Sequence, residues 1–175
     1  KEAIGEIGPP PVHERDRRTS EQVIAKIEAH ALQDDAAPFF GLLFFDAAHA
    51  YNPPEDSRPF EPYWETVAYE RLNAESPRAP FLNLFRNAAH YDDRLIGKVL
   101  QALENTGVGR NTIVIFTSDH GQSFNELGNN IWNHSGSFQP GEMLVPMVVK
   151  MPERFSWPVS TVEYTSSHYD VVPTL

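Results

Sequence analysis

The chain has 175 residues, 41% of them hydrophobic and 22% charged, which are ordinary values for a globular domain. Its formal charge of −10 argues against a nucleic-acid partner, although a bound dication could still attract an anionic substrate. The absence of cysteine excludes disulfides, thiolate metal ligands and a cysteine nucleophile.

The first part of the chain predicts a polar leading segment followed by a helix. Residues 1–18 are polar and contain three consecutive prolines, which favours irregular structure. Thr19 and Gln22 have the spacing of a capping box, and apolar residues then recur at helical spacing up to about residue 33. We therefore expect residues 1–37 to form a leading segment and a first helix.

A continuous apolar run follows Pro38, from Phe39 to Phe45. Such a run is typical of a strand that a parallel sheet buries on both faces. Open α/β sheets bind their ligands beyond the carboxyl ends of their strands, and His49 lies just beyond this run. His49 is therefore a candidate site residue, with a structural histidine as the alternative.

The middle of the chain predicts a short helix over 62–73 and a longer one from Pro80 to Asn105. Gly107 is expected to end the longer helix. His90 lies at the edge of the apolar stripe of this longer helix. At that position it could be a site residue or a partly exposed structural histidine. The stripe recurs at helical spacing and consists of Leu82, Phe85, Ala89, Ile96, Val99, Leu100 and Leu103.

A second buried strand is predicted from Asn111 to Ser118, and it delivers Asp119 and His120 to its C-terminal end. Neighbouring side chains of a strand point to opposite faces, but a turn that Gly121 permits would let both face one site. A carboxylate and an imidazole together suit Zn²⁺, Mn²⁺ or a related dication. The alternative is an aspartate that caps a turn beside a surface histidine.

The last part of the chain predicts a loop, a strand and a helix. The loop covers 122–142 and contains His134, for which a solvated loop histidine is the alternative to a site residue. Leu144 to Met151 reads as a third strand, and Ser167 is expected to cap a final helix. Strands that alternate with helices indicate an α/β fold, here a mostly parallel sheet flanked by helices.

These motifs resemble the alkaline phosphatase/sulfatase superfamily. Asn111–Gly121 resembles its downstream metal motif, Ala89–Asp93 the helix before that motif, and Val145–Val149 and Ser167–Leu175 the elements after it. The resemblance is closest to lipoteichoic-acid synthases, phosphoethanolamine transferases and the sulfatase-like inner-membrane proteins of Gram-negative envelopes. It implies a partial alkaline-phosphatase-like domain over 38–175, truncated at both ends.

The resemblance implies roles for five residues. Asp119 and His120 would be ligands of a divalent metal, either Mn, Zn, Mg or Ca, and this piece of the chain could leave that site empty. The sulfate or phosphate group of the substrate would contact three histidines, namely His49, His90 and His134. The formylglycine signature of true sulfatases is absent. We therefore expect the nucleophile and an acidic pair upstream of Lys1, and no activity in the isolated chain.

The activity that the resemblance implies is hydrolysis or transfer of sulfate or phosphate esters. It would be that of a sulfuric ester hydrolase or a phospho- or phosphoglycerol transferase, with a small molecule or a lipid head group as substrate. No lysine occurs between Lys98 and Lys150, where true sulfatases place one. This favours the membrane-anchored, phospholipid-handling or sulfatase-like branch over the arylsulfatases. The resemblance to that branch implies a domain in the periplasm or on the extracytoplasmic face of the membrane.

Two alternatives stay open. The first is a catalytically inactive sulfatase-like domain with a binding or regulatory role in a bacterial envelope membrane protein. The second is an unrelated α/β domain in which Asp119 and His120 occur together by chance. The residue at the nucleophile position would separate an enzyme from a binding domain, and the sequence does not predict an oligomeric state.

Overall fold

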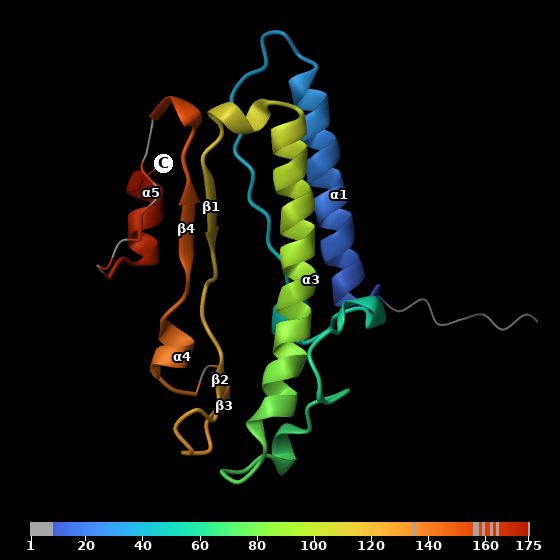
Figure 1. Cartoon of the computed structure of the whole chain (residues 1–175), viewed down its shortest axis with the longest axis vertical. Helices are drawn as coiled ribbons and strands as arrows, with labels where there is room; N and C mark the ends of the chain where they lie inside the picture. The colour runs from blue at the N-terminus through green and yellow to red at the C-terminus, as the bar shows by residue number, and fades with distance from the viewer. Residues whose placement is uncertain are drawn as a thin grey trace, which may run out of the picture. The chain divides into compact units, whose positions relative to one another are not determined.

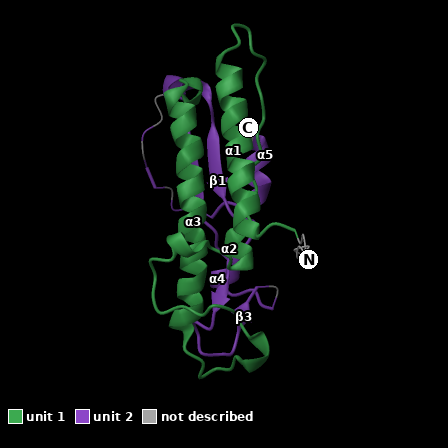
Figure 2. Cartoon of the chain, turned by 90° about the vertical axis from the view of Figure 1, so that its right-hand side faces the viewer, with its two compact units in different colours: residues 1–109 green, residues 110–175 purple. Residues whose placement is uncertain are grey.

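The computed structural model describes residues 9–134, 136–155 and 165–174, together with Pro158, Ser160, Thr161 and Glu163. The chain divides into two compact units, Lys1–Gly109 and Arg110–Leu175 (Figure 2). In the described residues the first unit is helical, and every strand belongs to the second. No helix in these ranges combines the length and apolar character needed to cross a membrane.

The first unit is built on two long helices, α1 (Val12–Ala31) and α3 (Arg78–Asn105), which lie side by side (Figure 1). The short helix α2 (Ala47–Ala50) packs against both of them. Two 3₁₀ turns follow α2, namely η1 (Glu55–Ser57) and η2 (Tyr69–Arg71). The predicted helix over 62–73 is thus reduced to the single turn η2.

Helix α1 begins at Val12, ahead of the predicted start at Thr19. The Pro11 carbonyl accepts hydrogen bonds from the backbone N–H groups of Glu14 and Arg15, at 3.0 and 3.2 Å. Arg17 then forms ion pairs along the helix with Glu14, at 2.6 Å, and with Glu21, at 2.5 Å. Ion pairs at this spacing stabilise the helical turns that precede Thr19. Thr19 therefore lies inside the helix and is not its N-terminal cap.

The apolar core of the first unit joins all three helices. Ala47, Tyr91 and Leu95 are buried there, and Val12 and Phe45 pack against them. The face of α3 that is buried differs from the predicted stripe, of which only Val99 and Leu103 are buried. The apolar residues that α3 buries are Phe81, Leu84, Ala88, Tyr91, Leu95, Val99, Ala102 and Leu103. The packing of α1 and α2 on α3, which periodicity alone cannot show, decides this face.

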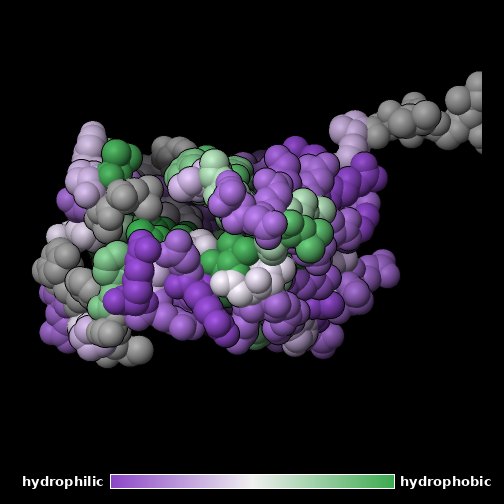
Figure 3. Space-filling model, turned by 90° about the horizontal axis from the view of Figure 1, so that it is seen from above, coloured by the Kyte–Doolittle hydropathy of each residue, from purple (hydrophilic) through white to green (hydrophobic). Residues whose placement is uncertain are grey.

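The run from Phe39 to Phe45 is not the buried strand that its composition predicts. Its backbone forms no strand, and Phe40 and Leu42 are 77% and 80% exposed. A strand needs a neighbour for its ladder of hydrogen bonds, and no strand occurs among the described residues of this unit. Apolar residues also reach the surface on the face drawn in Figure 3.

Helix α3 ends where the sequence predicts. Thr106 is its C-terminal cap residue, and Gly107 follows with a φ of 75°. That left-handed conformation costs a glycine little, because glycine has no Cβ. The Gly107 N–H donates to the Glu104 carbonyl at 3.0 Å, so the chain leaves the helix in a tight turn.

The second unit contains two small antiparallel sheets. Strand β1 (Val114–Thr117) pairs with β4 (Met147–Lys150), with Val114 opposite Lys150 and Thr117 opposite Met147. Strand β2 (Ser123–Phe124) pairs with β3 (Trp132–Asn133). The strands predicted around 111–118 and 144–151 therefore exist. The mostly parallel sheet is not found in the described residues, because each strand there pairs with an antiparallel neighbour.

Short helical segments complete the second unit. They are η3 (Val108–Asn111), which begins at the junction of the units, α4 (Pro140–Met143), η4 (Glu153–Phe155), η5 (His168–Asp170) and α5 (Val171–Thr174). Ser167 caps the last pair, as predicted, in a capping box with Asp170. The Ser167 N–H donates to the Asp170 carboxylate at 2.7 Å, which satisfies a donor at the start of the turn.

Candidate functional site

The end of β1 places Asp119 and His120 side by side. One carboxylate oxygen of Asp119, Oδ1, accepts the His120 backbone N–H at 3.0 Å. The Ser118 hydroxyl donates to the His120 carbonyl at 2.7 Å, which closes the turn after the strand. The other oxygen, Asp119 Oδ2, then lies 3.9 Å from His120 Nε2. The two side chains are 65% and 40% exposed, so solvent reaches the pair.

A hydrogen bond of the His120 ring selects its tautomer. Nδ1 lies 2.8 Å from the Gly121 carbonyl oxygen, which can only accept, so Nδ1 carries a proton. In the neutral ring the lone pair is therefore on Nε2, on the side of Asp119. Donors that share one ion at about 2.0–2.2 Å lie roughly 3–4 Å apart. The separation of 3.9 Å is at the upper end of that range.

Gly121 has a different role from the one that the sequence suggests. Its φ is not positive, so the turn does not require a glycine for its backbone conformation. Its N–H donates to the Glu142 carbonyl at 2.7 Å, and the Gln122 N–H donates to the Gly141 carbonyl at 2.8 Å. A Cβ at Gly121 would collide with the Gly141 carbonyl oxygen. The glycine therefore allows α4 to approach the backbone beside the Asp119–His120 pair.

The hairpin of β2 and β3 brings His134 beside His120. Ser123 pairs with Asn133 in this hairpin, and His134 is the next residue. The two imidazole rings have centroids 4.3 Å apart and planes inclined by 30°. His134 Nδ1 lies 3.1 Å from the Gln122 side-chain oxygen, which orients the ring. Three of the five predicted site residues thus gather in the second unit, namely Asp119, His120 and His134.

Glu142 is a buried carboxylate of this region that the sequence did not single out. Only 5% of it is exposed, and it accepts hydrogen bonds from the hydroxyls of Ser123 and Ser137, at 2.9 and 2.7 Å. Burial acts to raise the pKa of Glu142, but the bonds from Ser137 and Ser123 and the nearby His134 outweigh it and lower this pKa. A glutamate in a short Pro-Gly-Glu segment carries no sequence signal for such a role.

His168 also lies against the end of β1. Its Nε2 is 2.7 Å from the Ser118 carbonyl oxygen, so Nε2–H donates to the backbone one residue before Asp119. This contact gives His168 a structural role in the second unit. It fixes the start of η5 to the same strand end that carries the candidate metal ligands.

The other two predicted residues, His49 and His90, belong to the first unit. His49 is on α2 with its side chain 57% exposed, and its Nδ1 lies 3.4 Å from the Asp46 carboxylate. His90 is half-buried on α3, and its ring packs edge-on against Phe60 with centroids 6.3 Å apart. Since the two units are described separately, the convergence of these histidines on Asp119 stays a prediction.

Asp119 and His120 can offer a metal ion two donors of suitable chemistry, a carboxylate oxygen and an imidazole nitrogen. Within the described ranges, no group of three or more His, Cys, Asp or Glu residues is arranged to hold a metal ion. The remaining coordination positions would then be taken by water, substrate or further ligands, as in open catalytic sites.

Comparison with known proteins gives a consistent result. A model of the sulfatase family matches residues 7–175. The steryl-sulfatase of Rattus norvegicus is 35% identical over 101 residues, which are 52% of this chain and 17% of the relative. The iduronate 2-sulfatase of Mus musculus is 32% identical over 113 residues, 60% of this chain and 19% of the relative. The phosphoethanolamine transferase EptA of Helicobacter pylori is 28% identical over 121 residues, 65% of this chain and 22% of the relative. The chain spans about a fifth of the length of these relatives.

Proposed function

Because this chain belongs to the sulfatase family, an α/β family of the alkaline phosphatase/sulfatase superfamily, we propose that it supplies part of the metal and anion site of a sulfate- or phosphate-ester hydrolase or transferase. The observation that carries the proposal is the approach of Asp119 Oδ2 to His120 Nε2 at the end of β1. The sulfatases and the phosphoethanolamine transferase among its relatives support both ester classes.

Asp119 and His120 would hold a divalent ion in this site. The Asp119 carboxylate supplies negative charge, and the Gly121 carbonyl keeps the His120 lone pair on Nε2. A bound dication would supply positive charge that stabilises developing charge on the ester oxygens and lowers the pKa of the attacking group. An imidazole donor suits Zn²⁺ and Mn²⁺ better than Mg²⁺ or Ca²⁺, which prefer oxygen ligands.

His134 would contact the sulfate or phosphate group. Its ring lies beside His120, and His134 is close enough to Glu142 to help lower the pKa of that carboxyl. A protonated ring donates from both nitrogens, so one N–H can serve Gln122 while the other serves an anionic oxygen. His49 and His90 are assigned to the same group by the resemblance to lipoteichoic-acid synthases, and a small molecule or a lipid head group would carry it.

The test uses the full-length protein that contains this chain. Chromogenic sulfate and phosphate esters are offered in parallel with Mn²⁺, Zn²⁺, Mg²⁺ or Ca²⁺. We expect Asp119→Asn and His120→Gln to lower kcat/KM by roughly 100-fold or more, since the first removes the charge of the carboxylate ligand and the second replaces the imidazole nitrogen with a weaker amide donor. His30→Gln is the control, because its ring packs on Phe39 in the other unit. Unchanged turnover in both ligand variants would refute the proposal.

The same assay separates the enzyme from an inactive binding domain. Bound metal without turnover of either ester under any of these conditions would favour the binding or regulatory domain. The isolated chain is proposed to be inactive, because the nucleophile is expected outside it and covalent catalysis needs one. The extracytoplasmic location and membrane anchoring of the whole protein remain part of this proposal.

A further inference from the structure

Carboxylates from two long helices hold the turn that carries His49. Asp16 of α1 accepts hydrogen bonds at one oxygen from the backbone N–H groups of Asp46 and Ala47, at 3.0 and 2.7 Å. Asp92 of α3 accepts the Ala48 N–H at 3.2 Å. Three successive N–H groups at the start of α2 are therefore bonded to two carboxyl groups from different helices. The next residue along the chain is His49.

Both carboxyl groups are buried, which is unusual for acids that lie close together. Asp16 is 3% exposed and Asp92 is 8% exposed. The second oxygen of Asp92, Oδ1, is buried and has no hydrogen-bond partner among the described residues. Burial, and then the charge of Asp16, raise the pKa of Asp92 to about 7, and burial also raises the pKa of Asp16. Two ionised carboxylates at this place would repel each other in a medium that screens poorly.

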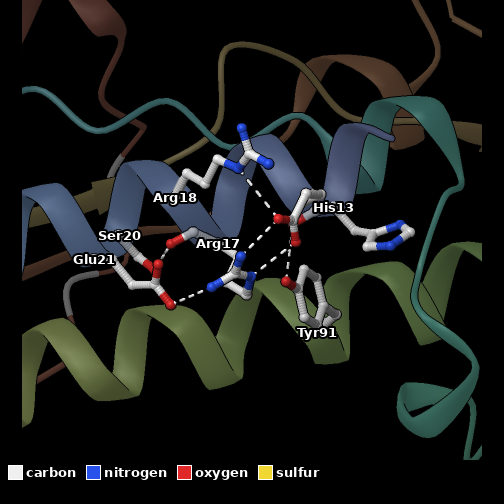
Figure 4. A network of polar contacts seen from close by, with 7 residues as sticks. His13, Arg17, Arg18, Ser20, Glu21 and Tyr91 are labelled. Carbon is white, nitrogen blue, oxygen red and sulfur yellow. Dashed lines mark hydrogen bonds and ion pairs between the residues drawn. The ribbon is translucent and has the colours of Figure 1, made fainter. Parts of the chain in front are cut away.

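The nearby cations are engaged with other acids. Arg15 pairs with Asp46 at 3.0 Å, at the exposed edge of the turn. Arg17 is bonded to Glu14 and Glu21, its neighbours on α1 (Figure 4). Asp46, which also lies 3.4 Å from His49 Nδ1, adds a third negative charge and raises the pKa of Asp92 further. Backbone N–H groups, rather than cations, thus balance the charge on Asp16 and Asp92.

Packing fixes the carboxyl groups where they are. Ala47 is fully buried between the helices, in the cluster formed with Tyr91 and Leu95. Tyr91, the neighbour of Asp92, reaches from α3 to α1, where its hydroxyl donates to the His13 carbonyl at 2.8 Å (Figure 4). The carboxyl groups cannot swing into solvent without breaking this core, so protonation is the available way to relieve their repulsion.

We propose that Asp16 and Asp92 are positioning residues for His49, and that one proton held by this carboxyl pair keeps the α2 turn in place. With the proton on Asp92, the charge of Asp16 meets the N–H donors of Asp46 and Ala47, and the neutral Asp92 accepts from Ala48. When the proton leaves, the Ala48 N–H bonds more strongly to the ionised Asp92, but the repulsion between the two buried charges opposes this gain. The repulsion pushes the two carboxylates apart, so the α2 turn loosens and His49 shifts. Only the consequence for substrate binding rests on the proposed function.

The experiment follows the wild-type chain by nuclear magnetic resonance. Amide hydrogen exchange at Asp46, Ala47 and Ala48, corrected for intrinsic rates, should lose protection by about tenfold or more between about pH 6 and pH 8. Carbon-13 shifts of the side-chain carboxyl groups should show Asp92 titrating near the value of about 7. Constant protection together with an Asp92 midpoint near 4, its ordinary value, would overturn the proposal.

Three variants sharpen the result. Asp92→Asn keeps an acceptor for the Ala48 N–H but carries no charge. In this variant the protection of the Ala48 amide against hydrogen exchange should not change over this pH range. Asp16→Asn should lower the Asp92 midpoint, because the neighbouring charge is gone. Asp93→Asn, at the exposed neighbour of Asp92, should behave as the wild type. If Asp93→Asn abolished the pH dependence as well, the assignment to Asp92 would be wrong, and the wild-type titration tests the idea even if a variant fails to fold.

In the full-length protein the same proton should affect turnover. KM for the ester should rise several-fold above about pH 7, and Asp92→Asn should remove that rise, which a purely structural role would not do. Absence of any ester turnover would count against the proposed function alone, since the exchange measurement does not need it. Turnover with a KM that has the same pH profile in the wild type and in Asp92→Asn would refute the positioning role.

Discussion

The Tyr91 hydroxyl on α3 donates a 2.8 Å hydrogen bond to the backbone carbonyl of His13 in the first turn of α1. The two residues are far apart in the sequence, so this bond ties the start of α1 to the middle of α3. The Tyr91 ring is 7% exposed and belongs to the core around Ala47. The contact therefore supports the helix pair on which the turn with His49 is mounted.

Removing this hydroxyl should destabilise the first unit. Tyr91→Phe keeps the ring in the core but leaves the His13 carbonyl without this donor, at an expected cost of about 1–2 kcal/mol in the free energy of unfolding. Urea denaturation, followed by circular dichroism, measures the change. Tyr169→Phe is the control, because Tyr169 is 92% exposed. Equal midpoints for Tyr91→Phe and the wild type would show that the bond contributes nothing.

Two glycine substitutions should have opposite effects on stability. Gly121→Ala places a Cβ against the Gly141 carbonyl and strains the two backbone bonds there, which should cost about 1–3 kcal/mol. Gly97→Ala adds a methyl group inside α3 that meets no atom within 4 Å beyond its chain neighbours and the nearby helix backbone, and should stabilise the helix by about 0.5–1 kcal/mol. Thermal unfolding of both variants compares them. A tolerated Gly121→Ala would mean that α4 can move away from the strand end.

Metal binding by the isolated chain should be weak. Asp119 and His120 offer two protein donors, whereas a catalytic zinc site commonly has three. We expect a Kd for Zn²⁺ or Mn²⁺ in the micromolar range or weaker by calorimetric titration, and its loss in His120→Ala. His30→Ala, in the other unit, should bind as the wild type does. Nanomolar affinity that depends on His120 would reveal further ligands, with His134 the first to examine.

The stability of the second unit should fall in acid because of Glu142. The folded pKa of this carboxyl is lowered, so its contribution is present above the unfolded pKa and is lost as the pH falls through the folded pKa. Glu142→Gln should therefore destabilise the unit near neutral pH. On acidification this variant should lose less stability than the wild type does. Urea midpoints at several pH values measure this, with the exposed Glu153→Gln as the control. Parallel pH curves for Glu142→Gln and the wild type would contradict the assignment.

Local features of this protein follow from its sequence because neighbouring residues produce them. Gly107 ends α3 through its own backbone freedom, and Ser167 caps the last helical turns through a bond to Asp170. The apolar residues of β1 predict a strand, and the turn after it makes Asp119 and His120 face each other through bonds within three residues. These contacts need no partner from a distant part of the chain.

Other features depend on contacts that no local pattern encodes. The run from Phe39 to Phe45, in which Phe40 and Leu42 are exposed, is apolar enough for a buried strand, yet a strand exists only where another backbone completes its hydrogen bonds. The antiparallel pairing of β1 with β4 is likewise a choice of partner. In the sequence, Asp16 and Asp92 look like ordinary acidic residues on a helix surface. Only the packing of α1, α2 and α3 buries them and brings them within hydrogen-bond distance of three backbone N–H groups. Burial and long-range pairing are properties of the assembled chain, so the tertiary structure alone decides them.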